Sequence, residues 1–190
     1  MRGLRPRSGP PVSSIPLGRM RLHHVSDQAD IEVFEPRIPP TPSPAAPYPV
    51  VWAVDEPRLV NYLVPRECPR VTFYVAPTTT ASDRLRFFGR GPLHPVVAIE
   101  AGWLQRAIDT ALWVYELPSQ TFACIDQSAG YFVSRVSVTA ISRRLVASPL
   151  LALASAGAEL RVLPSLHALA AEVAASSLAF SCIRMRNAAS

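Results

Sequence analysis

Two adjacent histidines near the start of the chain are of a residue type that suits chemistry. His23 and His24 lie in the segment RLHHV (21–25), whose composition predicts a short strand. Neighbouring side chains of a strand point to opposite faces, so one imidazole should face the core or a cleft. Such a histidine could hold a ligand hydroxyl, or it could be a hydrogen-bonded core residue, and the sequence leaves both readings open.

Arginines and tyrosines follow at positions that could contact an anionic or aromatic ligand. Arg135 comes shortly after Tyr131, and Arg184 and Arg186 alternate at the end of the last apolar segment. Guanidinium groups bind phosphate in bidentate geometry, although these arginines could equally pair with the chain's own acids. Tyr62 and Tyr131 are the aromatic residues that we expect to stack on a ligand, whereas most other rings should lie in the core.

The loop PRECPR places Cys68 between two arginines, which could lower the pKa of its thiol. A hydrolase that uses Cys68 as nucleophile is therefore one hypothesis, although no histidine is placed beside it by the sequence. The three cysteines are far apart, and no Cys or His spacing suits a metal. We expect reduced thiols and no metal site.

Several classes of protein are excluded by what the sequence lacks. It contains no Walker A loop, no GxGxxG, HExxH or GxSxG motif, and no EF-hand loop. All 19 basic residues are arginine; residues 1–19 contain four of them and no acidic residue. Residues 20–190 carry 15 arginines against 14 acids, so the basic surface of a nucleic-acid-binding protein is missing.

Residues 1–19 differ from the rest of the chain. They contain no apolar run long enough for a signal peptide, and we expect a disordered tail or an over-long start with Met20 as the initiator. Residues 20–190 should form one domain, because their number suffices for a real core. We expect a cytoplasmic protein without a membrane span, with an extended, proline-rich surface loop at 35–49.

Strand patterns outnumber helix patterns within this domain. The sequence therefore predicts an α+β fold, in which short helices flank one mixed, largely antiparallel sheet of about six to eight strands. Strands are predicted at 21–25, 31–34, 50–54, 70–75, 96–100, 111–117, 121–125, 131–141, 160–163 and 178–185, and helices at 55–64, from a cap at Ser82 or Asp83 to Gly89, at 102–109, 149–157 and 165–177.

Four segments resemble a family of bacterial proteins of unknown function, DUF6886. They are MRLHHVSDQADIEVFEPR (20–37), VVWAVDEPRLVNYLVPRECPRVTFY (50–74), GYFVSR (130–135) and FSCIRMRNA (180–188). The resemblance covers nearly the whole chain from Met20 to about Ala188 and supports Met20 as the natural start. It implies no activity.

Three shorter segments are similar to patterns of ADP-ribosyltransferase-like folds. LHHVS (22–26) is similar to the first-strand pattern Leu-Tyr-His-Gly-Ser/Thr, although Val25 replaces the glycine. WAVDEPRLVNYL (52–63) is similar to the second pattern, in which a strand ending in a small residue, here Ala53, precedes a helix that carries a tyrosine. GYFVSRVSV (130–138) is similar to the strand that usually carries a catalytic glutamate, but Gly130 stands in its place.

This second resemblance implies a ligand, NAD or a related ADP-ribosyl compound. It implies that His24 holds the ribose, that Tyr62 and Tyr131 stack on the nicotinamide, and that Arg21 or Arg135 pairs with the pyrophosphate. Without the glutamate, transfer chemistry lacks its usual carboxylate. The alternative is a non-catalytic protein-interaction module, which the nearly neutral domain and the proline-rich loop would also suit.

Overall fold

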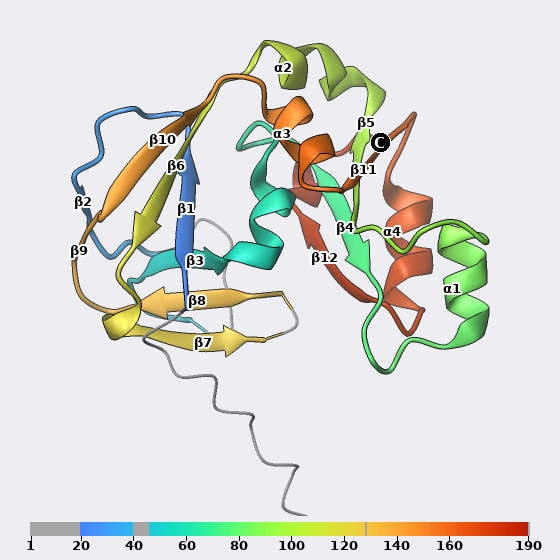
Figure 1. The fold of residues 1–190 in the computed structure, drawn as a ribbon, viewed down its shortest axis with the longest axis horizontal. Coiled ribbons are helices and arrows are strands. Elements are labelled where there is room, and N and C mark those ends of the chain that lie inside the picture. Colours follow the sequence, from blue (N-terminus) through green and yellow to red (C-terminus); the bar gives the residue numbers. More distant parts are fainter. Residues whose placement is uncertain (1–19, 40–45, 128, 190) are drawn as a thin grey trace, which may run out of the picture.

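Two β-sheets form the framework of the protein, and a 3-10 helix packs between them (Figure 1). The computed structural model describes residues 20–39, 46–127 and 129–189. The tail expected at 1–19 and the central part of the proline-rich loop, 40–45, lie outside the described residues. Within these residues, no helix is long and apolar enough to cross a bilayer.

The larger sheet has six strands, and every neighbouring pair is antiparallel. Because β10 and β7 lie at its edges, β1 and β3 are central. In spatial order the strands are β10 (Ser142–Val146), β6 (Leu112–Leu117), β1 (Leu22–Ser26), β3 (Val51–Asp55), β8 (Tyr131–Ser134) and β7 (Phe122–Asp126).

The smaller sheet has four strands and one parallel pair, β11 with β5. A two-stranded ribbon, β2 (Val33–Phe34) with β9 (Val138–Thr139), packs on the larger sheet through Phe34 and Val138 but forms a separate strand pair. In spatial order the smaller sheet contains β11 (Glu159–Leu163), β5 (Val96–Glu100), β4 (Arg70–Tyr74) and β12 (Ala179–Ile183).

Short helices connect and cover these sheets. The 3-10 helix η2 (Glu56–Tyr62) follows β3, while α1 (Ala81–Phe88) and α4 (His167–Ala174) cover the outer face of the smaller sheet (Figure 1). The other helices of the described residues are η3 (Ala101–Trp103), α2 (Leu104–Asp109), η4 (Ser119–Thr121), α3 (Pro149–Ser155) and η5 (Met185–Asn187).

The main hydrophobic core lies between the two sheets. Val54 and Val114 from the larger sheet meet Val97 and Ile99 from the smaller one, and Leu59 of η2 packs among them. Further clusters cover the outer faces, one around Tyr115 and Phe34 and one around Phe73 and α4. Since side chains alternate along each strand, every central strand sends one set of side chains inward and one set outward.

The α+β class, the antiparallel preference and the short helices are confirmed. The single sheet of six to eight strands is wrong, because the strands divide into two main sheets. The predicted strand 131–141 ends at Ser134, whose hydroxyl donates to the carbonyl of Val136 and turns the chain. Strand β10 escaped prediction because four of its five residues are exposed, which removes the apolar alternation.

Two helix starts also differ from the prediction. Residues 56–62 of the segment 55–64 form a 3-10 helix; Asp55 caps it as predicted, but Pro57 stands at its second position, after Glu56, and not at the first. Helix α1 is capped by Thr80, whose side chain accepts a hydrogen bond from the backbone N–H of Asp83, and not by Ser82 or Asp83. Asp83 instead accepts from Ser177, which ties α1 to the chain before β12.

Candidate functional site

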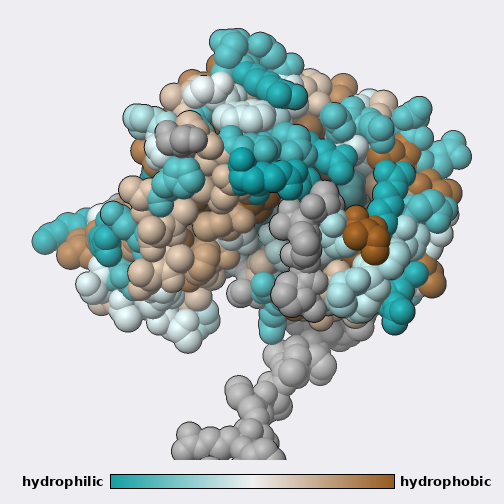
Figure 2. Space-filling model, turned by 180° about the vertical axis from the view of Figure 1, so that it is seen from behind, coloured by the Kyte–Doolittle hydropathy of each residue, from teal (hydrophilic) through white to brown (hydrophobic). Residues whose placement is uncertain are grey.

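Two adjoining hollows open between the sheets, and together we call them the inter-sheet cleft. The first, of 590 Å³, is lined by Arg58 of η2 and Tyr74 of β4, among others. The second, of 620 Å³, is lined by Tyr131 of β8 and Cys182 of β12, and Ala76 and Ala179 line both. Seen from behind, the surface is indented between the two halves of the molecule (Figure 2).

Strand alternation explains which side chains face this cleft. On β4, Val71 and Phe73 pack outward under α4, so Arg70, Thr72 and Tyr74 point toward the larger sheet. On the larger sheet, Tyr131 pairs with Val54, a residue of the core between the sheets. The cleft is therefore more polar than the core beside it.

Arg58 links the two sheets at the base of the cleft. Its Nε donates to the hydroxyl of Tyr74 at 3.1 Å, and its Nη1 lies 3.3 Å from Oδ2 of Asp55. Its guanidinium also lies 5.0 Å from the centre of the Tyr74 ring, a cation–π arrangement. Burial raises the pKa of Asp55, and the charge of Arg58 opposes that shift.

Asp55 occupies space that a side chain at position 130 would need. Gly130 has a φ of 66°, and a Cβ built on it would lie 2.5 Å from Oδ1 of Asp55. The backbone N–H of Asp55 donates to the carbonyl of Gly130 at 3.1 Å. A carboxylate from β3 thus stands next to the glycine that precedes Tyr131.

Four residues form a second polar group, which we call the arginine–tyrosine cluster. It consists of Tyr62, Arg70, Tyr131 and Arg184, and it borders the cleft through Tyr131. Burial, and to a smaller extent the nearby phenol of Tyr131, raise the pKa of Tyr62 well above its usual value. The guanidinium of Arg70 lies 5.2 Å from the centre of the Tyr62 ring.

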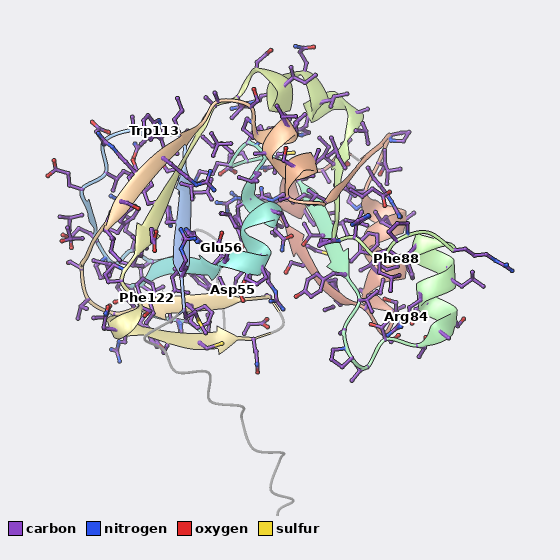
Figure 3. All side chains as sticks on the ribbon, viewed as in Figure 1. Asp55, Glu56, Arg84, Phe88, Trp113 and Phe122 are labelled. Carbon is purple, nitrogen blue, oxygen red and sulfur yellow. The ribbon has the colours of Figure 1, made fainter. Side chains whose placement is uncertain are left out.

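A histidine–carboxylate pair lies nearby, where β3 runs into η2. Nε2 of His23 is 2.6 Å from Oε2 of Glu56, and His23 is only 2% exposed. Its Nδ1 is buried and has no hydrogen-bond partner among the described residues. Figure 3 places Asp55 and Glu56 next to each other at the centre of the molecule.

The comparison with protein families assigns the chain. The model of DUF6886, described as a family of unknown function, matches residues 23–188. The chain belongs to the DUF6886 family. No curated protein and no solved structure gives a significant match.

In this DUF6886 protein, two of the five expected ligand-binding residues come together. Tyr62 and Tyr131 are 69 positions apart, yet both lie beside the same part of the core: Tyr131 is paired with Val54, and Tyr62 packs on the cluster that contains Val54. Arg21 lies 3.3 Å from Glu56 and 3.1 Å from Glu116, so two carboxylates hold its guanidinium. Arg135 stacks over the ring of Tyr48 at 4.5 Å.

His24 faces away from the cleft, whereas its neighbour His23 faces the core side. The His24 ring packs on Phe34 at 4.8 Å, in the cluster on the outer face of the larger sheet. Its Nδ1 lies 2.9 Å from the carbonyl of Trp52, and the Trp52 ring meets Tyr131 edge to face at 5.8 Å. Burial lowers the pKa of His24.

Sequence reasoning did not select Arg70, Asp55 or Arg58 as functional residues of this DUF6886 protein. Arg70 could have been noticed, because it opens the apolar strand RVTFY, where a charged residue is unusual. Asp55 was expected only to cap a helix, and no local pattern links it to Gly130. Arg184 and Arg186 do not share a strand face, since β12 ends at Ile183, and both contact Glu67.

The Cys68 thiol is unsuited to nucleophilic catalysis. The residue is fully buried, and burial raises its pKa to about 11, despite the opposing charge of Arg70. We therefore expect iodoacetamide at pH 7.5 to modify the exposed Cys124 and Cys182 in the folded protein, while Cys68 reacts only after unfolding. Peptide mass spectrometry would check this, and rapid labelling of Cys68 in the native protein would contradict it.

Proposed function

We propose that this DUF6886 protein binds NAD or another ADP-ribosyl compound in the inter-sheet cleft. The observation that carries the proposal is that Tyr62 and Tyr131 lie beside the same part of the core, since Tyr131 is paired with Val54 and Tyr62 packs on the cluster that contains Val54. These residues come from two of the three segments that are similar to ADP-ribosyltransferase-like patterns, and they meet at the edge of a hollow between two sheets. The first of those segments contributes β1 to the same sheet.

The size and lining of the cleft suit such a ligand. Each hollow lies within the range of about 300–1,000 Å³ that is typical of small-molecule sites. Tyr74 and Tyr131 offer aromatic surface for a base, and Arg58 offers a cation beside Tyr74. Flat aromatic groups and a few polar groups are the usual means of binding a nucleotide.

His24 would act indirectly in this proposal. Its hydrogen bond with the carbonyl of Trp52 fixes the residue whose ring supports Tyr131. It would therefore position an aromatic residue of the site rather than touch the ribose. Asp55, beside Gly130, would supply a carboxylate near the position where the similar folds carry a glutamate.

Thermal unfolding of the full chain with millimolar NAD, ADP-ribose and AMP tests the proposal. A ligand present at a hundred times its dissociation constant stabilises the folded state by about 2.7 kcal/mol, which raises the midpoint by several degrees. We expect such a shift with NAD or ADP-ribose, and Tyr131→Ala should remove most of it. Tyr48→Ala, at a tyrosine outside the cleft lining, should retain it. No shift with any nucleotide would overturn the proposal.

A protein-interaction module is a second candidate, and one edge of the larger sheet favours it. β10 is an edge strand, and Ile141 and Leu145 beside and within it are 64% and 52% exposed. An exposed apolar edge is a place where an extended segment of a partner can add as another strand. Co-purification of a partner in equal amounts, without any response to nucleotides, would favour this candidate.

A further inference from the structure

Arg70 is a buried cation without an anion beside it. The residue is 3% exposed, and no carboxylate lies within ion-pair distance of it among the described residues. Its Nε and Nη1 donate to the backbone carbonyls of Asn61, Pro65, Arg66 and Cys68. In the described part of the chain, no hydrogen bond reaches its Nη2, so two N–H donors remain.

Arg184 brings a second guanidinium to the same place. Arg70 is paired with Ile183 across the β4–β12 ladder, so Arg184 is the next residue along the chain from that partner. The Nε of Arg184 lies 3.4 Å from Oε1 of Glu67, and its side chain is 17% exposed. No hydrogen bond to its Nη1 or Nη2 occurs within the described residues. The backbone of Arg184 is left-handed, with a φ of 55°.

The two cations repel each other, and although Glu67 pairs with Arg184, no carboxylate of the described residues pairs with Arg70. Burial lowers the pKa of Arg70, and the positive charge of Arg184 lowers it further. Two like charges in a poorly solvated place destabilise each other unless an anion lies between them. The Tyr62 ring lies 5.2 Å from the Arg70 guanidinium, and Tyr131 lies beside the same part of the core, so their hydroxyls add hydrogen-bond donors at this point.

We propose that Arg70 and Arg184, together with the hydroxyls of Tyr62 and Tyr131, form a binding site for a phosphoryl or pyrophosphoryl group. A phosphate group has enough oxygens to accept from both guanidiniums and from the tyrosines at once, and arginine binds it in bidentate geometry. Under the proposed function the occupant is the pyrophosphate of the ADP-ribosyl ligand. Only the identity of the rest of the ligand rests on the proposed function; the phosphoryl-binding site itself does not depend on it.

Calorimetric titration of the full chain with inorganic pyrophosphate, at constant ionic strength, tests the site. Arg184→Asn removes the guanidinium while keeping a residue type that tolerates left-handed backbone. Its matched control is Arg186→Asn, which removes an equal charge that also contacts Glu67. We expect Arg184→Asn to weaken pyrophosphate binding at least tenfold and Arg186→Asn to change it less than twofold.

A second variant covers the case in which Arg184→Asn fails to fold. Tyr62→Phe removes one hydroxyl and keeps the ring beneath Arg70, and we expect it to weaken pyrophosphate binding about tenfold to a hundredfold, the range that one hydrogen bond to a charged group supplies. Absence of pyrophosphate binding to the wild type overturns the inference. Equal effects of Arg184→Asn and Arg186→Asn overturn it as well.

Titration with ADP-ribose separates this inference from the proposed function. Binding of ADP-ribose that is unaffected by Arg184→Asn leaves the proposed function standing and overturns the phosphoryl site. Pyrophosphate binding that depends on Arg184, without any binding of ADP-ribose or NAD, supports the phosphoryl site and overturns the proposed function.

Discussion

Replacement of Arg70 by alanine is expected to lower the free energy of unfolding by about 3–5 kcal/mol, as removal of one partner from a buried charged network usually does. The guanidinium holds one backbone carbonyl of η2 and three of the segment between η2 and β4. Without it, these carbonyls lose their donor in a place that water hardly reaches, and a void remains beneath Tyr62. Urea unfolding followed by circular dichroism would measure the loss.

Two further variants give this prediction its controls. Arg66→Ala removes an exposed arginine from the same segment, and we expect a change within about 0.5 kcal/mol. Arg70→Lys keeps the charge, but an ammonium group cannot donate to several carbonyls in the fixed geometry of a guanidinium. Its loss in free energy of unfolding should therefore lie between those of Arg66→Ala and Arg70→Ala. A loss below 1 kcal/mol for Arg70→Ala would mean that the carbonyls find other donors and that the guanidinium is not structural.

Gly130→Ala is expected to destabilise the protein by about 2–3 kcal/mol. A left-handed backbone costs a residue with a Cβ about 1–2 kcal/mol, and displacement of a helix cap costs about 1 kcal/mol more. Both apply here, because φ is positive and the new methyl group would lie 2.5 Å from Oδ1 of Asp55. That carboxylate caps η2 through the backbone N–H of Arg58.

Gly157→Ala separates the two effects. Gly157 follows α3 with a φ of 75°, and a Cβ there would meet nothing closer than Nδ1 of His94 at 3.9 Å, an ordinary contact. It should therefore show only the backbone strain, about 1–2 kcal/mol. If urea unfolding gave the same loss for both glycines, contact with Asp55 would have no energetic effect, and the carboxylate would be free to move.

Most of the fold could be predicted because the buried strands have local sequence patterns that are typical of strands. The segments VVWAV, RVTFYV and VVAIE are apolar and β-branched, and they form β3, β4 and β5 as predicted. Strand β10 could not be predicted from its own residues, since its exposed side chains follow no period. Its pairing with β6 is a tertiary effect. The division into two sheets depends on long-range pairing in the same way.

The candidate site was harder to predict than the fold. Tyr62 and Tyr131 were selected as rings that could bind a ligand, and their meeting follows from the β3–β8 pairing, which places Tyr131 opposite Val54. Which of the two histidines would face the core could not be predicted, because alternation along a strand does not say which face is turned toward the other sheet. In the structure, His23 faces the core between the sheets and His24 faces the outer cluster. Asp55 and Gly130 lie close together although they are 75 positions apart, and no pattern in the sequence around either residue predicts this.

The path of the chain through the two sheets has a consequence for how the protein folds. The chain builds β1 and β3 of the larger sheet, then β4 and β5 of the smaller one, returns for β6, β7, β8 and β10, and ends with β11 and β12 in the smaller sheet. The larger sheet is complete only when β10 has emerged, and the smaller sheet only when β12, the last strand, has emerged. Unfolding should therefore be one cooperative transition, and folding should be slow compared with that of helical proteins of this size, because distant segments must pair first.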